Sequence, residues 1–411
     1  MNSKLLAELW KIDATVHEND NRVEETRLFS EYKRNIRRQE RKEVWHRVKQ
    51  LGCGGFGTVH LEVNRENQRL RAVKKIKIDT SFGHKDYPAE LNTLLEFSQP
   101  RSKEQDLFVE FFGWFQHGSY LFLAMEYVEK LDLETYVATR TGKVSEIGAG
   151  LITKQILQGL EFMHRGKFAH RDLKPANVMV VRGAPQWWVK LADFGLSKKL
   201  GKSEVFMSNG GTPPYMAPER CYSSGPGSSS RGCTYAVDLW ATGCIAYRLV
   251  VGVVPFPTDE AFPTEGALFK FCRDESHFPL KPLTESNVGD SCISFIKALL
   301  TISPIERPSA VDALGHAWIT SVASTDYPTS ELQDPDIQWN SDIDSFLDIP
   351  PSVDTAAKSP TKLLPAAPRQ TEPVVEEPEG DEGGASGHAD GSAAAQRRGE
   401  SRHASRNAAA Q

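Results

Sequence analysis

The sequence has few cysteines, and they are not arranged to hold a metal ion or a disulfide framework. Its six cysteines form no CxxC pair and have no histidine cluster beside them; they are Cys53, Cys221, Cys233, Cys244, Cys272 and Cys292. This spacing argues against a zinc site and against a small disulfide-stapled domain, and it suits a reducing compartment. We interpret all six as core or surface thiols.

Long hydrophobic runs and an excess of one charge are also missing. The most apolar stretch, GCIAYRLVVGVVPF, is interrupted by Arg248 and ends in proline, and the first residues, MNSKLLAELWKID, lack the apolar run of a signal peptide. A net charge of −5 argues against nucleic acid or an anionic membrane as the main partner. We therefore expect a cytoplasmic or nuclear protein without a membrane span, and a monomer by default.

The chain of 411 residues is long enough for a large core, and its composition changes along its length. Residues 1–44 form a charged extension in which Phe29, Tyr32 and Ile36 have helical spacing, so we predict a solvated helix over 22–43. Its basic run is alternatively a nuclear address. Residues 45–319 alternate apolar runs with turn signals and are predicted to form the folded domain.

Residues 320–411 are predicted to be a disordered tail. From Pro350 onward the tail consists largely of Pro, Ala, Gly, Ser and Glu, which cannot bury enough apolar surface to offset chain entropy. One island, IQWNSDIDSFLDI (Ile337–Ile349), sets apolar residues among aspartates. We interpret it either as a docking peptide, for this protein's own domain or for a partner, or as a transient contact of the tail.

A glycine-rich stretch gives the first chemical signal. LGCGGFGTVHLEV contains Gly52, Gly54 and Gly57 in a GxGxxG pattern, which on its own would also fit a dinucleotide-binding oxidoreductase. That fold opens a helix directly after the glycines, whereas here the chain continues with the β-branched, alternating TVHLEV. The pattern therefore predicts a hairpin whose backbone amides can approach phosphate groups.

A lysine follows on the next predicted strand. RAVKKIKI carries Lys74, which can reach phosphate oxygens beneath a glycine hairpin as a point charge. We expect Glu90, in AELNTLLEF on a predicted helix, to hold this lysine in place. Each of the two residues taken alone would be read as a surface charge.

The stretch HRDLKPANVM places three chemically suited side chains on one loop. A hydroxyl that attacks a phosphoryl group needs a carboxylate near its proton, a cation for the developing charge, and oxygen ligands for magnesium. Asp172 would orient the hydroxyl, Lys174 would contact the γ-phosphate, and Asn177 would offer an amide oxygen to the metal. Asp193, at the end of the apolar strand in VKLADFGLS, supplies a second hard oxygen ligand for Mg²⁺.

Taken together and in this order, these motifs resemble those of eukaryotic protein kinases. The set GxGxxGxV, AVK, HRDLKPxN, DFG and APE extends from Leu51 to Glu219, and YAVDLWATGCIAY and SPIERPSA continue the resemblance. It implies an α+β fold with a β-rich N-lobe and a mainly helical C-lobe, and ATP and Mg²⁺ bound between them. HRDLKP and GTPPYMAPE are similar to the serine/threonine type. Glu219 and Arg307 match the pair that anchors the activation segment.

The resemblance also implies which residues contact the nucleotide and which are regulatory. Met125 would be the gatekeeper, Glu126 and Val128 the hinge, and Asp132 the ribose contact. The remaining nucleotide contacts would be Leu51, Gly52, Cys53, Gly54, Gly55, Phe56, Gly57, Thr58, Val59, Ala72 and Lys74. We expect Ser208 to be phosphorylated, by an upstream kinase or by the protein itself, and its phosphate to pair with Arg171 and Lys198.

Two function classes follow from these residues. The first is an active serine/threonine kinase that transfers the ATP γ-phosphoryl group to hydroxyls of protein substrates. The second is a pseudokinase, which keeps the fold as a scaffold that binds nucleotide or partners without transfer. Lys74, Asp172, Asn177 and Asp193 discriminate between the two classes, and because all four are present we favour the enzyme.

Overall fold

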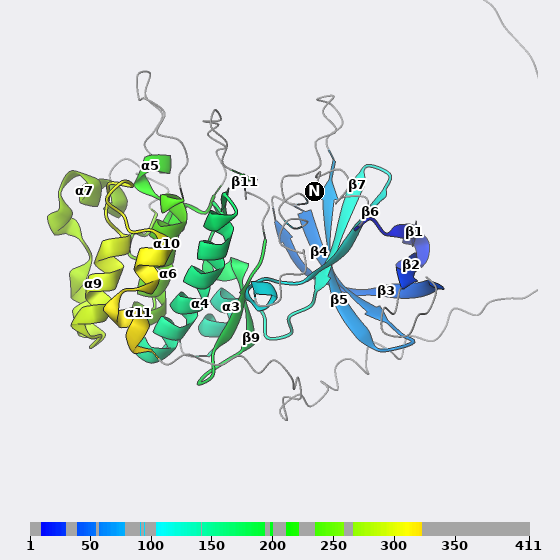
Figure 1. Ribbon diagram of the computed structural model, residues 1–411, viewed down its shortest axis with the longest axis horizontal. Coiled ribbons are helices and arrows are strands. Elements are labelled where there is room, and N and C mark those ends of the chain that lie inside the picture. Colours follow the sequence, from blue (N-terminus) through cyan, green and yellow to red (C-terminus); the bar gives the residue numbers. More distant parts are fainter. Residues whose placement is uncertain are drawn as a thin grey trace, which may run out of the picture. The chain divides into compact units, whose positions relative to one another are not determined.

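The computed structural model describes several stretches of the chain between Trp10 and Val322. These are residues 10–29, 39–54, 57–78, 91, 94, 104–140, 142–193, 198–199, 211–221, 235–258 and 266–322. Figure 1 shows strands β1 to β7, in blue to cyan, gathered as one group, and helices α3 to α11, in cyan-green to yellow, gathered as a second. The tail, including Ile337–Ile349, lies outside the described residues.

Seven strands form one sheet in the N-terminal part of the chain. Its order is β1-β2-β3-β4-β5-β7-β6, and the neighbouring strands are antiparallel. The strands are β1 (Asp13–His17), β2 (Arg22–Phe29), β3 (Gln39–Gly54), β4 (Gly57–Asn64), β5 (Arg69–Lys77), β6 (Phe111–His117) and β7 (Tyr120–Glu126). The β-rich lobe expected from the sequence is thus confirmed.

The helix predicted over 22–43 is wrong for residues 22–29 and 39–43, which belong to strands, whereas residues 30–38 lie outside the described residues. β2 pairs with β3 from Arg22↔His46 to Phe29↔Gln39, and β3 runs across position 45, where we placed the start of the folded domain. Burial in β2 follows a period of two, with Val23 and Glu25 inward and Glu24 outward. One of the inward positions carries a glutamate, so hydrophobicity alone does not reveal the alternation.

The N-terminal segment closes this sheet on itself. The Ile12 amide donates to the Trp114 carbonyl at 2.7 Å and the Trp114 amide donates to the Trp10 carbonyl at 3.0 Å, so the chain before β1 pairs with β6 at the other end of the sheet. Gly113, with φ of +129°, permits this close approach, because a Cβ there would collide with the Ile12 side chain and the Trp10 carbonyl.

A charge network is buried between the N-terminal strands and the centre of the sheet. Arg71 on β5 contacts Glu25 of β2 at 2.7 Å and Glu62 of β4 at 2.9 Å, and all three side chains are fully shielded from solvent. The Arg71 guanidinium lies 4.0 Å from the Trp45 ring centroid, and the Trp45 indole N–H donates to Glu25 at 3.1 Å. We call these four residues the buried charge network.

Alternation along β5 gives its two faces different roles. Arg71 and Val73 face the interior of the closed sheet, where Val73 joins a small apolar cluster with Trp45, Phe115 and Phe122. Ala72 and Lys74 point to the opposite face. The β-strand period thus places the lysine on the face away from the buried charge network.

The C-terminal part of the chain is mainly helical and contains the main core. Its helices are α3 (Leu133–Ala138), α4 (Glu146–Arg165), α5 (Pro218–Cys221), α6 (Ala236–Val251), α7 (Ala267–Arg273), α8 (Leu280–Glu285), α9 (Asp290–Leu299), α10 (Ala310–Leu314) and α11 (Ala317–Ser321). α4 begins where Ser145 accepts a hydrogen bond from the Gly148 amide, and α6 ends at Gly252 in a left-handed conformation. Both helices are buried along most of their length.

Short strands lie between α4 and α5 and carry the loops of the site. They are β8 (Phe168–Ala169), β9 (Val178–Arg182), β10 (Trp188–Leu191) and β11 (Lys198–Lys199), paired as β9–β10 and β8–β11. Of the helices in the described stretches, none has both the length and the apolar character needed to cross a bilayer. The five cysteines in these stretches are free thiols.

Candidate active site

The glycine motif forms the predicted hairpin between β3 and β4. Gly54 pairs with Gly57, and Gly52 pairs with Val59. Gly57 has φ of +131°, and a Cβ there would overlap the Lys75 carbonyl, so no larger residue fits. Cys53 is exposed in the hairpin, whereas Gly55 and Phe56 lie outside the described residues.

Lys74 meets an aspartate from the other part of the chain. Its ammonium lies 2.7 Å from Asp193 Oδ1, and the lysine is almost fully buried whereas the aspartate is one-third exposed. Asp193 has φ of +55°, which turns the chain directly after β10. Glu90 lies outside the described residues, so its pairing with Lys74 remains a prediction.

A cleft of about 280 Å³ lies between the sheet and the helical part. Eleven residues that we predicted for the site line it, namely Leu51, Gly52, Val59, Ala72, Lys74, Met125, Glu126, Val128, Asp132, Asn177 and Asp193. Sequence reasoning missed seven further lining residues, Leu94, Val109, Tyr127, Leu131, Ala176, Met179 and Ala192. The predicted Cys53, Gly54, Gly57 and Thr58 are not among the lining residues.

Two predicted contacts at the mouth of the cleft have clear structural partners. Both carboxylate oxygens of Glu126 lie within 2.9 Å of the Lys190 ammonium on β10, so this side chain joins the sheet to the helical part. Asp132 is the N-cap of α3 and accepts hydrogen bonds from the amide and the hydroxyl of Thr135. The cap fixes the orientation of this carboxylate at the edge of the cleft.

Asp172, Lys174 and Thr212 form a compact triangle beside the cleft. The Thr212 hydroxyl donates to Asp172 Oδ1 at 3.0 Å, and the Lys174 ammonium contacts Asp172 Oδ2 at 3.0 Å and the Thr212 hydroxyl at 2.8 Å. Asp172 is 7% exposed. We had predicted no role for Thr212, although the GTPPYMAPE stretch that contains it was a signal.

Asn177 is oriented by the same loop. Its amide nitrogen donates to the Asp172 carbonyl at 2.7 Å. The amide oxygen therefore remains as an acceptor on a residue that lines the cleft. Asn177 and Asp193 thus bring two oxygen-bearing side chains to one cleft, the donor type that Mg²⁺ prefers.

A buried aspartate on α6 fixes the backbone before Asp172. Asp238 accepts from the His170 amide at 2.9 Å and from the Arg171 amide at 2.8 Å, and its Oδ2 lies 2.9 Å from His164 Nε2. Burial by itself raises the pKa of this carboxyl, but the His164 hydrogen bond, the attraction of His164 and His170, and the Arg171 amide bring the pKa below its ordinary value. The carboxylate therefore stays ionised and holds the loop.

The predicted pair of Glu219 and Arg307 is present. Arg307 donates from two nitrogens to the two Glu219 oxygens, at 2.8 and 3.2 Å, and also to the carbonyls of Thr301, Ala236 and Ile302. The guanidinium is fully buried, so this fork anchors α5 to α6 and to the segment before α10. Ser208 lies outside the described residues, and its phosphorylation remains a prediction.

Comparison with known proteins gives a consistent family. The protein kinase domain family matches residues 45–319. The serine/threonine-protein kinase RAD53 of Saccharomyces cerevisiae is 31% identical over 276 residues, which cover 66% of this chain and 32% of RAD53. The serine/threonine-protein kinase cds1 of Schizosaccharomyces pombe is 28% identical over 290 residues, covering 69% of this chain and 60% of cds1.

A mitogen-activated protein kinase kinase kinase 5 of Arabidopsis thaliana is 28% identical over 291 residues, covering 70% of this chain and 38% of the relative. The chain thus spans less than two thirds of the length of each of these relatives. The family match covers more than half of the chain and agrees with the two-lobed fold and with the order of its motifs. The chain therefore belongs to the protein kinase family.

Proposed function

We propose that this protein is a serine/threonine protein kinase that transfers the γ-phosphoryl group of ATP to hydroxyls of protein substrates. The observation that carries the proposal is the triangle of Asp172, Lys174 and Thr212 beside the cleft that contains Lys74 and Asp193. A carboxylate, two ammonium groups and oxygen donors are thereby brought to one place, which is what phosphoryl transfer requires. Two of the matched relatives, RAD53 and cds1, are named serine/threonine-protein kinases.

The lining of the cleft fits a nucleotide. Leu51, Val59 and Ala72 come from the sheet and Met179 from β9, so apolar side chains of both parts form walls that suit a flat base. Lys74 adds a cation suited to phosphate oxygens. The donor chemistry of Asn177 and Asp193 fits a divalent ion such as Mg²⁺, which neutralises charge on bound phosphates.

Each polar residue beside the cleft has its own role in phosphoryl transfer. Asp172 accepts a hydrogen bond from the substrate hydroxyl and orients its oxygen for attack, while the Thr212 hydroxyl fixes the carboxylate from its other side. Lys174 places a positive charge next to the same carboxylate, where it stabilises charge that develops on the transferred group. Asp238 fixes the backbone just before Asp172, and the Glu219–Arg307 fork anchors the segment that follows Thr212.

The test is transfer of label from [γ-³²P]ATP to generic protein substrates, comparing the wild type with Asp172→Asn, in Mg²⁺ and in EDTA. We expect the wild type alone to label serine and threonine, in Mg²⁺ only, by phosphoamino-acid analysis. A fluorescent ATP analogue checks that both proteins bind nucleotide. If both bind nucleotide and neither transfers label, after treatment with an activating kinase as well, the pseudokinase interpretation replaces this proposal.

A further inference from the structure

A second cavity, larger than the nucleotide cleft, lies within the helical part of the protein. It has a volume of about 700 Å³ and is lined by the second half of α3, the residues that lead into α4, the β9–β10 turn, and the C-terminal ends of α6 and α8. Apolar lining residues include Tyr136, Val144, Trp187, Val250 and Val288. We call this cavity the helical groove, and it shares no lining residue with the cleft.

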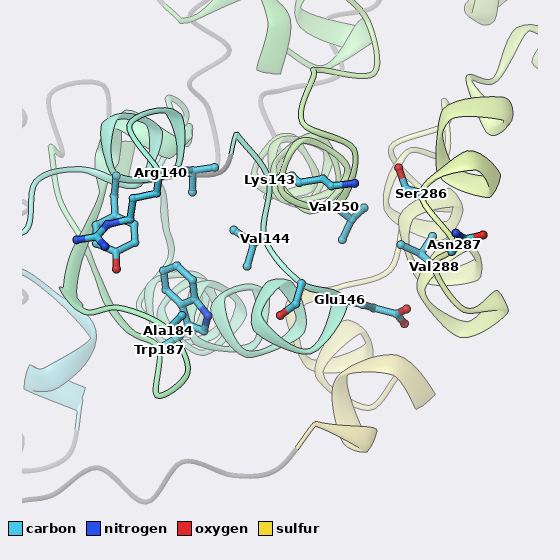
Figure 2. A pocket seen from close by; sticks show the side chains of 13 residues that line it. Arg140, Lys143, Val144, Glu146, Ala184, Trp187, Val250, Ser286, Asn287 and Val288 are labelled. Carbon is cyan, nitrogen blue, oxygen red and sulfur yellow. The ribbon is translucent and has the colours of Figure 1, made fainter.

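The helical groove has apolar residues in its centre and basic residues at its edge. Figure 2 shows Val144 near the middle, Arg140 and Trp187 toward one end, and Val250, Glu146 and Asn287 toward the other. Arg140 and Lys143 are both exposed, and the Arg140 guanidinium lies 4.5 Å from the Tyr136 ring centroid. Basic groups beside apolar walls suit an occupant that is both acidic and apolar.

The acidic lining residue, Glu146, is directed elsewhere. Its carboxylate accepts from the Gly289 amide at 2.9 Å, at the N-terminus of α9, where a negative charge is stabilised by the helix dipole. The side chain of Ile147, the next residue, is 68% exposed, and that of Val253, just beyond α6, is 59% exposed. Two apolar residues that lie within three positions of lining residues in the chain are thus exposed to solvent.

The described part of the chain ends beside this groove. The Val322 side chain packs against Gly150 of α4, and the Lys154 ammonium lies 3.5 Å from the Val322 carbonyl. Gly150 is about one helical turn, or ~6 Å, from Glu146 in the groove lining. The 14 residues from 323 to 336 span up to ~45 Å when extended, so whatever follows them reaches the groove easily.

The segment that follows has the matching chemistry. In IQWNSDIDSFLDI (Ile337–Ile349), Trp339, Ile343, Phe346 and Leu347 have the i, i+4, i+7, i+8 spacing of one helix face. Aspartates stand between them, and residues 323–357 contain eight acidic residues and no Lys, Arg or His. The acidic charge of this segment thus complements the basic edge of the helical groove, and its apolar face complements the apolar walls.

We propose that Ile337–Ile349 docks in the helical groove of its own chain. Its apolar face contacts Tyr136, Val144 and Trp187, and its aspartates face Arg140 and Lys143. The chain's own segment is favoured over one from another molecule because a short tether raises the local concentration to the millimolar range. The groove is therefore an intramolecular docking site, separate from the site of phosphoryl transfer.

The test uses the full chain and a fluorescein-labelled peptide of residues 335–351. The tail variant carries three substitutions, Trp339→Ala, Phe346→Ala and Leu347→Ala, which remove apolar side chains of the docking segment so that it no longer occupies the groove. By fluorescence anisotropy, we expect the peptide to bind the tail variant at least ~10-fold more tightly than the wild type, in which the native segment competes. The matched control Leu363→Ala with Leu364→Ala removes apolar side chains elsewhere in the tail and should leave peptide binding as in the wild type.

Charge reversal identifies the groove as the binding surface. Arg140→Glu with Lys143→Glu, made in the tail variant, should weaken peptide binding at least ~10-fold, and added salt should weaken binding to the tail variant. Lys281→Glu, on a side chain that is 84% exposed on α8 and outside the groove lining, is the matched control and should change little.

Three results would overturn the proposal. Equal peptide binding by the wild type and the tail variant would show that the segment does not occupy the groove in its own chain. If charge reversal at Arg140 and Lys143 left the affinity of the peptide unchanged, the peptide would bind at another surface. A photo-crosslinking amino acid at Phe346 should join residues within one chain, and crosslinked dimers instead would assign the groove to a second copy. None of these measurements depends on phosphoryl transfer, so they stand apart from the test of the kinase proposal.

Discussion

The buried charge network allows a quantitative test of how the N-terminal strands are joined to the kinase domain. In Arg71→Met, the side chains of Glu25 and Glu62 keep their fully shielded positions but lose the cation they share. Breaking a buried ion pair by removing one partner costs about 3–5 kcal/mol, because it leaves an uncompensated buried charge. At about 2–4 °C per kcal/mol for a large domain, the melting temperature should fall by roughly 10 °C.

A milder variant supplies the comparison. Glu25→Gln keeps an acceptor for the Trp45 indole and leaves Arg71 paired one-to-one with Glu62, so it should cost only about 1–2 kcal/mol. Replacing all three charges, by Glu25→Leu, Glu62→Leu and Arg71→Met together, should recover much of the loss.

The assay is thermal unfolding followed by intrinsic fluorescence, with urea unfolding at fixed temperature as a second measure. If Arg71→Met lost no more stability than Glu25→Gln, the carboxylates would not depend on this guanidinium, and the electrostatic reasoning would be refuted. If the triple variant were less stable than Arg71→Met, shape rather than charge would be the main contribution of the network.

Three further predictions concern the site and its anchors. Thr212→Val should lower kcat about 10–100-fold with little change in KM for ATP, because it removes a hydroxyl that donates to Asp172, and steady-state kinetics should find Thr212→Ser close to the wild type. Arg307→Lys keeps the charge but loses the fork to Glu219, so urea unfolding should show a loss of about 1–3 kcal/mol; an unchanged midpoint would contradict the anchoring role. The pKa of Asp238 in the folded protein is lowered below its ordinary value of 3.8. The ionised carboxylate therefore stabilises the fold at pH values above 3.8, and this stabilisation is lost as the pH falls through the lower pKa of the folded state. Melting temperatures across pH should therefore show Asp238→Asn less stable than the wild type at neutral pH, with the gap narrowing below about pH 4.

The structure brings together polar residues that the sequence singled out, and the signals that marked these residues are short and local. The glycine hairpin, the strand lysine Lys74 and the loop residues Asp172 and Asn177 are each defined by neighbours within a few positions. Thr212 was missed because its role arises only from contact with Asp172, 40 residues earlier. A motif indicates the chemistry of neighbouring residues, whereas a contact between residues far apart in the sequence depends on the fold.

The apolar walls and the N-terminal strands were missed for other reasons. Val109 and Met179 line the cleft, yet in sequence they are ordinary core residues, and no local feature separates the two roles. In β2, the inward-facing Glu25 interrupts the apolar alternation that would have indicated a strand. Its partner Arg71 is 46 residues away, so the compensation that makes its burial tolerable could not be recognised.

The closure of the sheet by Trp10–Ile12 against Trp114 has a consequence for folding during synthesis. About 100 residues separate Ile12 from Trp114, and a ribosome adds about 5–20 residues per second, so the segment before β1 is synthesised on the order of 5–20 s before its partner on β6. During that interval the edge of the emerging hairpin is unpaired and open to pairing with another chain. Once β6 has been made, the hydrogen bonds of Trp10 and Ile12 with Trp114 join the two ends of the sheet, so the N-terminal segment can close the lobe only after its last strand is synthesised.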